Sequence, residues 1–296
     1  MAGREVLVEP FEYIAPSSLA EAISLLADPV KNAKLLAGGT DLMVQMKRGH
    51  AQPAYLIDLK EIPGLGEIVF QPDHVIRLGA LVTAGEIVAS PEVAQHLPVL
   101  AETAGVIGSV QIRNRATIGG NLCRAAPSGD FAPILMALGA SLALAGPEGE
   151  RFIPVEELFL APGKTSLRPG ELLTQILVPV LPANAGAVYQ RFSYRETLDL
   201  ALVGAAVFLR LDPSSKTCLM ARIALASVAP VPLRAHAAEA MLSGKAPSQE
   251  LLGDCALAAA SEAAPIDDVY GTAWYKKQVL EAMVRRGLAK ALKDCE

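Results

Sequence analysis

Aromatic side chains and cysteines are both scarce in this chain of 296 residues. Phe, Trp and Tyr make up 5% of the sequence, so a ligand with flat rings would find few aromatic side chains to stack on. The four cysteines, Cys123, Cys218, Cys255 and Cys295, are far apart in sequence. No C-x-x-C pair is available for zinc or an iron–sulfur cluster, and the spacing favours reduced thiols.

Positive charge is neither abundant nor clustered. The chain has 26 Lys and Arg against 31 Asp and Glu, and its basic residues form no run that could bind along the phosphate backbone of a nucleic acid. We therefore expect no nucleic-acid partner. No apolar stretch is long enough to span a bilayer, and residues 1–6 lack the apolar core of a signal peptide. The sequence therefore predicts a cytoplasmic protein without an integral membrane segment.

Groups typical of a self-contained active site are also missing. The four histidines, at positions 50, 74, 96 and 236, are isolated and form no pair of metal ligands. No nucleophile–base or acid–base combination stands out. We therefore predict no metal site and no catalytic residue in this chain.

Apolar residues make up 52% of the chain, and their periods indicate three units with an α+β fold. Strands at 11–16, 34–37 and 55–59, with helices between them, predict a small α/β unit over residues 1–60. A mixed strand and helix pattern follows over residues 61–181. Residues 182–186 are the best linker, and residues 187–296 contain three strand-like runs and then helices.

Two glycine motifs about eighty residues apart carry the strongest functional signal. The first is Leu35-Leu36-Ala37-Gly38-Gly39-Thr40-Asp41-Leu42, and the second is Thr117-Ile118-Gly119-Gly120-Asn121-Leu122. Glycine permits positive φ and close approach of a ligand, and successive free N–H groups make an anion-binding concavity. Both motifs are predicted to be turns, and together they suggest a ligand with two adjoining phosphates.

Neither motif alone excludes a purely structural strand-to-helix turn, which is the commoner origin of a single short glycine motif. The motifs are also not the dinucleotide fingerprint G-x-G-x-x-G. The string Gly163-Lys164-Thr165-Ser166 ends like a P-loop, but Leu158 occupies the position of the required first glycine, so we interpret it as a loop.

The sequence around both motifs resembles that of one protein family. Ala37 to Leu42, Gln111 to Leu122 and Pro127 to Asp130 are similar to the FAD-binding medium subunits of molybdenum hydroxylases, a family that includes xanthine and carbon monoxide dehydrogenases. The resemblance covers nearly the whole chain. It implies two α/β lobes that hold FAD, followed by a C-terminal lobe with a three-stranded antiparallel sheet and a helical bundle.

The resemblance also implies which residues contact FAD. One wall is formed by Leu35, Leu36, Ala37, Gly38, Gly39, Thr40, Asp41 and Leu42, and the opposite wall by Gly108, Thr117, Ile118, Gly119, Gly120 and Asn121. Asp130 would accept hydrogen bonds from ribose or ribityl hydroxyls, or cap the helix that it precedes. Leu173 matches an apolar flavin contact but also suits plain core. Arg191 stands where relatives have a lysine near the flavin ring, and the two side chains differ in donor geometry.

The implied activity is electron transfer within a complex. Relatives pair with a small [2Fe–2S] subunit and a large molybdopterin subunit, which carry the iron–sulfur clusters and the molybdenum cofactor, in an expected dimer of heterotrimers. Two alternatives stay open: a flavin oxidoreductase that acts alone on its own substrate, and a non-enzymatic nucleotide-binding or assembly protein without flavin. The sequence does not name the organic substrate or the terminal electron acceptor.

Overall fold

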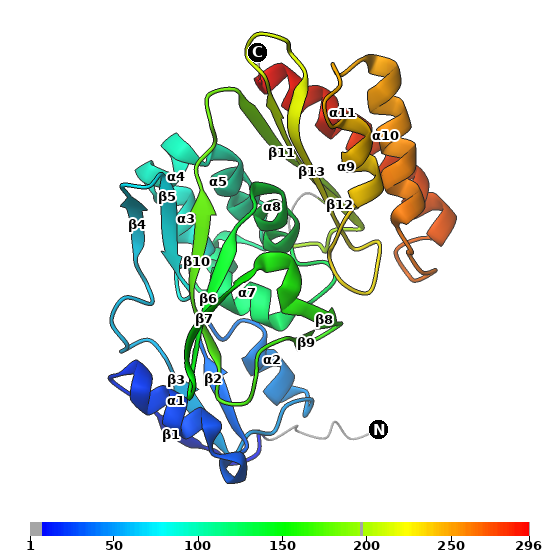
Figure 1. The fold of residues 1–296 in the computed structure, drawn as a ribbon. Coiled ribbons are helices and arrows are strands. Elements are labelled where there is room, and N and C mark those ends of the chain that lie inside the picture. Colours follow the sequence, from blue (N-terminus) through cyan, green and yellow to red (C-terminus); the bar gives the residue numbers. More distant parts are fainter. Residues whose placement is uncertain (1–7, 196–197, 296) are drawn as a thin grey trace.

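A capping side chain fixes where the first helix begins. In the computed structural model, which describes residues 8–195 and 198–295, the Ser18 hydroxyl accepts a hydrogen bond from the backbone N–H of Glu21. Strands and helices then alternate as β1 (Glu12–Ile14), α1 (Leu19–Ala27), η1 (Pro29–Lys31), β2 (Ala33–Leu36), α2 (Leu42–Lys47) and β3 (Tyr55–Asp58). The strands form a parallel sheet in the order β1-β3-β2, at the bottom of Figure 1.

A second, antiparallel sheet occupies the middle of the molecule. In spatial order its strands are β4 (Ile68–Gln71), β5 (Val75–Gly79), β10 (Leu172–Pro179), β6 (Ser141–Gly146) and β7 (Gly149–Pro154). Between β5 and β6 the chain forms α3 (Ala84–Ala89), α4 (Pro91–His96), α5 (Pro98–Gly105), α6 (Val110–Arg113), α7 (Ile118–Arg124) and α8 (Phe131–Leu138). Thr83 caps α3 and forms a capping box with Glu86.

Between β7 and β10 lie η2 (Val155–Leu158) and a two-stranded sheet of β8 (Phe159–Ala161) and β9 (Lys164–Thr165). The string at 163–166, interpreted as a loop from the sequence, therefore contains a short strand.

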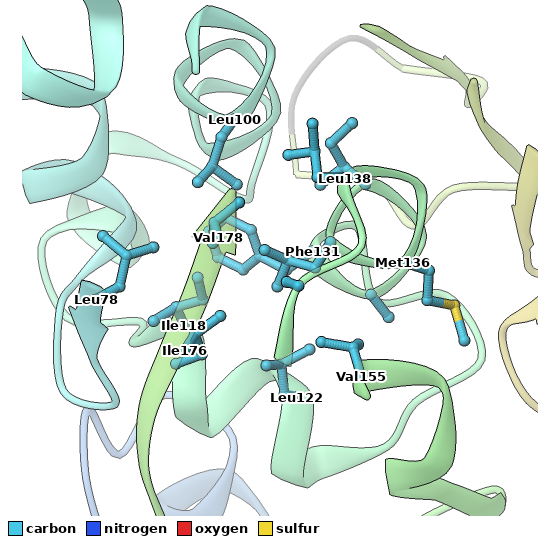
Figure 2. Packing of buried hydrophobic residues seen from close by; sticks show 14 of the residues in the cluster. Leu78, Leu100, Ile118, Leu122, Phe131, Met136, Leu138, Val155, Ile176 and Val178 are labelled. Carbon is cyan, nitrogen blue, oxygen red and sulfur yellow. The ribbon is translucent and has the colours of Figure 1, made fainter. Parts of the chain in front are cut away.

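One apolar cluster joins the middle sheet to its helices. Figure 2 shows Ile118 and Leu122 of α7 directed into the same cluster as Phe131 of α8 and Ile176 of β10. All four side chains are at most 1% exposed. Burying a large apolar side chain stabilises the fold by about 1.5–3 kcal/mol. The helix that contains the second glycine motif is therefore held firmly in place.

The C-terminal part combines an antiparallel sheet with three helices. Its strands are β11 (Ala185–Phe192), β12 (Val203–Leu211), β13 (Cys218–Ala226) and β14 (Leu233–Arg234), and its helices are α9 (His236–Leu242), α10 (Gln249–Glu262) and α11 (Ala273–Asp294). A tight turn joins β12 to its antiparallel partner β13, and Asp212 stabilises this turn by accepting hydrogen bonds from the N–H groups of Ser214 and Ser215. The sheet has a fourth strand, β14, which the sequence prediction of three strands missed because it is two residues long.

Both faces of this sheet are covered, which explains why β12 has no polar side chain from Val203 to Leu209 and has its charged residue, Arg210, exposed near its end. Ala206 and Phe208 pack into the cluster that contains α8, whereas Val207 and Leu209 pack against the C-terminal helices. Alternate residues of a strand point to opposite faces, so a stretch of strand that is covered on both sides is apolar at successive positions. Figure 1 shows α8 on one side of the sheet and α9 to α11 on the other. None of the helices in the described residues is long and apolar enough to cross a membrane.

A partly buried ion pair should make the middle unit sensitive to acid. Arg151 donates to both carboxylate oxygens of Glu171, at 2.8 Å each. Hydrogen bonds from Arg151 outweigh the effect of burial and hold the pKa of the Glu171 carboxyl below its usual 4.5. The stabilisation is therefore present above pH 4.5 and is lost as the pH falls through the folded-state pKa.

We expect Glu171→Gln to lower the free energy of unfolding at pH 7 by about 1.5–3 kcal/mol, the contribution of hydrogen bonds to a charged group. Urea unfolding at pH 7 and pH 4 measures the effect, and the difference from wild type should shrink at the lower pH. Glu148→Gln is the control, because Glu148 pairs with Arg168 on the surface. An equal loss at both pH values would contradict the role given to this pair.

Candidate functional site

The fold brings the first glycine motif against the residues that lead directly into the second. A Cβ atom at Gly38 would lie 1.8 Å from the carbonyl oxygen of Arg115, so the backbones touch where only glycine fits. A Cβ at Gly120 would lie 4.0 Å from the Cβ of Ala37. Segments far apart in the sequence therefore form one site between the N-terminal and middle sheets.

The first motif leaves its backbone donors free. Leu35 and Leu36 end β2, Gly39 turns the chain with a φ of +74°, and Leu42 begins α2. Among the described residues, none accepts a hydrogen bond from the backbone N–H groups of residues 37–41. Asp41 precedes α2, but its side chain makes no capping bond. This run of five unpaired donors, which includes Thr40, is what an anion-binding concavity requires.

The second motif differs from the sequence prediction. It is not a free turn, because Ile118 to Asn121 form the first turn of α7, capped by the Thr117 hydroxyl. The backbone N–H of Ile118 donates to Val82, that of Gly119 to Ala80, and that of Gly120 to Thr117 Oγ1 at 3.1 Å. These amides are occupied by the protein, and the Ile118 side chain is fully buried in the core. A ligand must meet this wall through other groups.

Three such groups are present. The space beside Gly120 is open except for Thr117 Oγ1 and the distant Ala37. The Thr117 hydroxyl accepts from Gly120, which leaves its own proton for another acceptor. Asn121 Oδ1 is buried without a hydrogen-bond partner among the described residues. A buried polar atom of this kind usually has a partner, so a ligand group that donates to it would complete the site.

Asp130 joins the middle unit to the C-terminal sheet. Its carboxylate does not cap α8 but accepts hydrogen bonds from Tyr189 Oη at 2.7 Å and Arg191 Nε at 3.2 Å. Burial raises the pKa of Asp130, against the lowering effect of Tyr189 and Arg191. Burial likewise raises the pKa of Tyr189 well above its usual value. Arg191 also donates to Ser193 Oγ at 2.7 Å and to the carbonyl of Asp199, so its guanidinium is held in one orientation.

The remaining predicted residues have structural roles that the sequence left open. Gly108 has a φ of +53°, and a Cβ there would lie 2.8 Å from Ile112, so this position also needs glycine. Leu173 is 4% exposed and belongs to the core cluster around α8.

Known proteins are similar to this chain in sequence and in fold. Residues 9–181 match the family described as "FAD binding domain in molybdopterin dehydrogenase", and residues 187–291 match the "CO dehydrogenase flavoprotein C-terminal domain". The chain belongs to the FAD-binding subunits of molybdopterin dehydrogenases. This confirms the resemblance stated from the sequence, together with FAD as the cofactor and an oxidoreductase subunit as the class of protein.

Relatives of this FAD-binding subunit match it over nearly their full length. The carbon monoxide dehydrogenase medium chain of Hydrogenophaga pseudoflava is 39% identical over 96% of this chain and 98% of that one. The xanthine dehydrogenase FAD-binding subunit of Escherichia coli O157:H7 is 30% identical over 95% of each chain. The structure of carbon monoxide dehydrogenase from H. pseudoflava that lacks the Mo-pyranopterin moiety superposes with a TM-score of 0.93, at 39% identity, over 98% of this chain and 100% of that one. That match confirms the α+β fold.

The residues of the FAD-binding subunit fit its cofactor. The unpaired donors of the first motif suit a pyrophosphate, and the Asn121 oxygen lacks only a donor. The opening beside Gly120 admits a group that a side chain would exclude.

Two residues of this site were not predicted. Tyr189 shares the Asp130 carboxylate with Arg191, and the i, i+2 spacing of the two on one predicted strand was the available signal. Arg124 forms an ion pair with Asp41, Nε to Oδ2 at 2.7 Å. Nothing in the sequence connects that pair, because its members come from different units of the fold.

Proposed function

We propose that this FAD-binding subunit takes electrons from [2Fe–2S] clusters of a small partner subunit and passes them to an external acceptor. The organic substrate would be converted in a large subunit that carries the molybdenum cofactor. The observation that supports the proposal is the run of five unpaired N–H groups at residues 37–41, in a chain whose family is defined by FAD. FAD supplies a ring system that accepts and releases electrons, and the protein positions it.

We assign the residues that hold FAD as follows. The N–H groups of residues 37–41 would bind the pyrophosphate, and Leu35, Leu36 and Leu42 would frame them. On the opposite wall, the Thr117 hydroxyl and Asn121 Oδ1 would bind polar groups, while Gly108, Gly119 and Gly120 keep the backbone close. Ile118 and Leu173 would support the FAD site from behind, because their side chains belong to the hydrophobic core.

Asp130 and Arg191 would act differently from the rest. Because they already bind each other, their part is to fix the C-terminal sheet against the site and to keep a cation near the ring of the cofactor. A cation there would stabilise added negative charge.

The proposed organisation is three units over residues 1–60, 61–181 and 187–296, of which the outermost residues, 1–7 and 296, lie outside the described part of the chain. The proposed assembly is a dimer of heterotrimers in the cytoplasm.

We expect the purified chain to be yellow, with one FAD that acid releases intact, and to hydroxylate no aromatic or heterocyclic substrate. Adding the iron–sulfur and molybdenum subunits should make FAD reduction depend on the organic substrate. Stopped-flow absorbance at the flavin band measures that reduction, and the mixture without the iron–sulfur subunit is the control.

Two outcomes would contradict the proposal. Substrate hydroxylation by the pure single chain would favour a self-contained flavin oxidoreductase. A colourless chain that takes up no FAD would favour the nucleotide-binding or assembly protein.

A further inference from the structure

A charge in the first motif conflicts with its proposed ligand. The backbone N–H of Asp41 belongs to the unpaired run, yet its carboxylate lies only a few bonds away. A carboxylate within about 6 Å of a phosphate repels it, and the repulsion is stronger near protein than in bulk water. An asparagine or threonine would avoid this cost, so the presence of aspartate requires a compensating charge.

Arg124 supplies a positive charge at that carboxylate. It comes from the last turn of α7, and its Nε lies 2.7 Å from Asp41 Oδ2, to which Gln45 Nε2 also donates. The other end of the guanidinium lies against the β8–β9 turn, since a Cβ at Gly163 would be 3.6 Å from Arg124 Nη1. The guanidinium thus lies between Asp41 and this turn, and the side chains of Arg124 and Asp41 remain 44% and 50% exposed.

We propose that Arg124 is a positioning residue that neutralises Asp41 and so allows the first motif to bind the pyrophosphate of FAD. The inference rests on the proposed function, because it concerns the same ligand. Arg124 acts on the ligand through Asp41, and its value to binding is the removal of a repulsion. A second effect follows from the same pair: it ties α2 to α7 across the site.

The test compares four variants of the full chain after removal and re-addition of FAD. We expect Arg124→Gln to raise the FAD dissociation constant about tenfold and Arg124→Lys to raise it less. Asp41→Asn should leave it within about threefold of wild type, and the double variant Asp41→Asn/Arg124→Gln should return to that range. Quenching of FAD fluorescence measures the constants, and ADP, as a displacing ligand that keeps the two phosphates, should show the same order.

The matched control is Arg168→Gln, which breaks the exposed Arg168–Glu148 pair at 3.1 Å in another part of the fold. It should leave FAD binding unchanged. Riboflavin, which has no phosphate, should bind wild type and Arg124→Gln equally.

Each other result has a distinct meaning. Equal weakening by Arg124→Gln and the double variant would overturn the inference, because it would show that Arg124 contacts the phosphate itself. Equal weakening by Asp41→Asn and Arg124→Gln would overturn it in favour of a simple tie between helices, and no effect of Arg124→Gln would overturn it outright. Wild type that binds no FAD would refute the proposed function instead, and this inference with it.

Discussion

Gly120→Val should abolish FAD binding and leave the fold in place. A Cβ at this position would lie 2.7 Å from Thr117 Oγ1, and the branches of valine would extend into the space that faces Ala37. The same side chain would displace the Thr117 hydroxyl, the polar group expected to meet the cofactor. Loss of that cap costs about 1 kcal/mol of stability, which a chain of this size tolerates.

FAD content after gel filtration and circular dichroism of the same sample measure the two expectations, and we expect at least a hundredfold weaker binding. Gly253→Val is the matched control, since Gly253 also lies in a helix but has no heavy atom within 4 Å of its Cβ position. Full FAD occupancy in Gly120→Val would show that Gly120 does not face the ligand.

Gly38→Ala should damage both the ligand site and the fold. Its Cβ would lie 1.8 Å from the Arg115 carbonyl oxygen, and backbone cannot move aside as a flexible side chain can. The first motif must therefore move away from residues 115–116, which costs about 1–3 kcal/mol as overpacking and opens the site between the two motifs. We expect a melting temperature several degrees lower, together with loss of FAD.

Gly66→Ala provides the comparison for that result, because nothing lies within 4 Å of its Cβ position. Thermal unfolding should be measured on FAD-free samples of both variants, so that lost ligand does not lower the melting temperature of one sample alone. A Gly38→Ala chain as stable as Gly66→Ala would mean that the first motif is not in contact with residues 115–116 in solution.

Local features of the fold could be predicted because their causes are local. Ser18 and Thr83 are N-cap residues that precede segments with the apolar periodicity of a helix. Asp212 begins a segment of residues that favour turns. The strand β14 was not predicted, because a strand of two residues is too short to show an alternating apolar pattern. Helix α7 was not predicted, because its two glycines favour a turn. Packing of Ile118 and Leu122 in the core stabilises the helix instead.

The site could be predicted in its sequence motifs but not in its hydrogen bonding. Both glycine motifs were found, yet only the first keeps free N–H groups, because those of the second donate to Val82, Ala80 and Thr117. The Asp41–Arg124 pair depends on how two units of the fold meet. Side chains that meet only through tertiary packing leave no mark in the local pattern.

The two-sided burial of β12 has a consequence for how this protein is made. Until residues 203–226 leave the ribosome, the outer side of α8 has no sheet to pack on, since Ala206, Phe208 and Ala224 belong to its cluster. The nascent chain must therefore wait with apolar surface exposed, the state in which large proteins aggregate or recruit chaperones. Asp130 likewise receives its hydrogen-bond partners Tyr189 and Arg191 only after β11 has been synthesised.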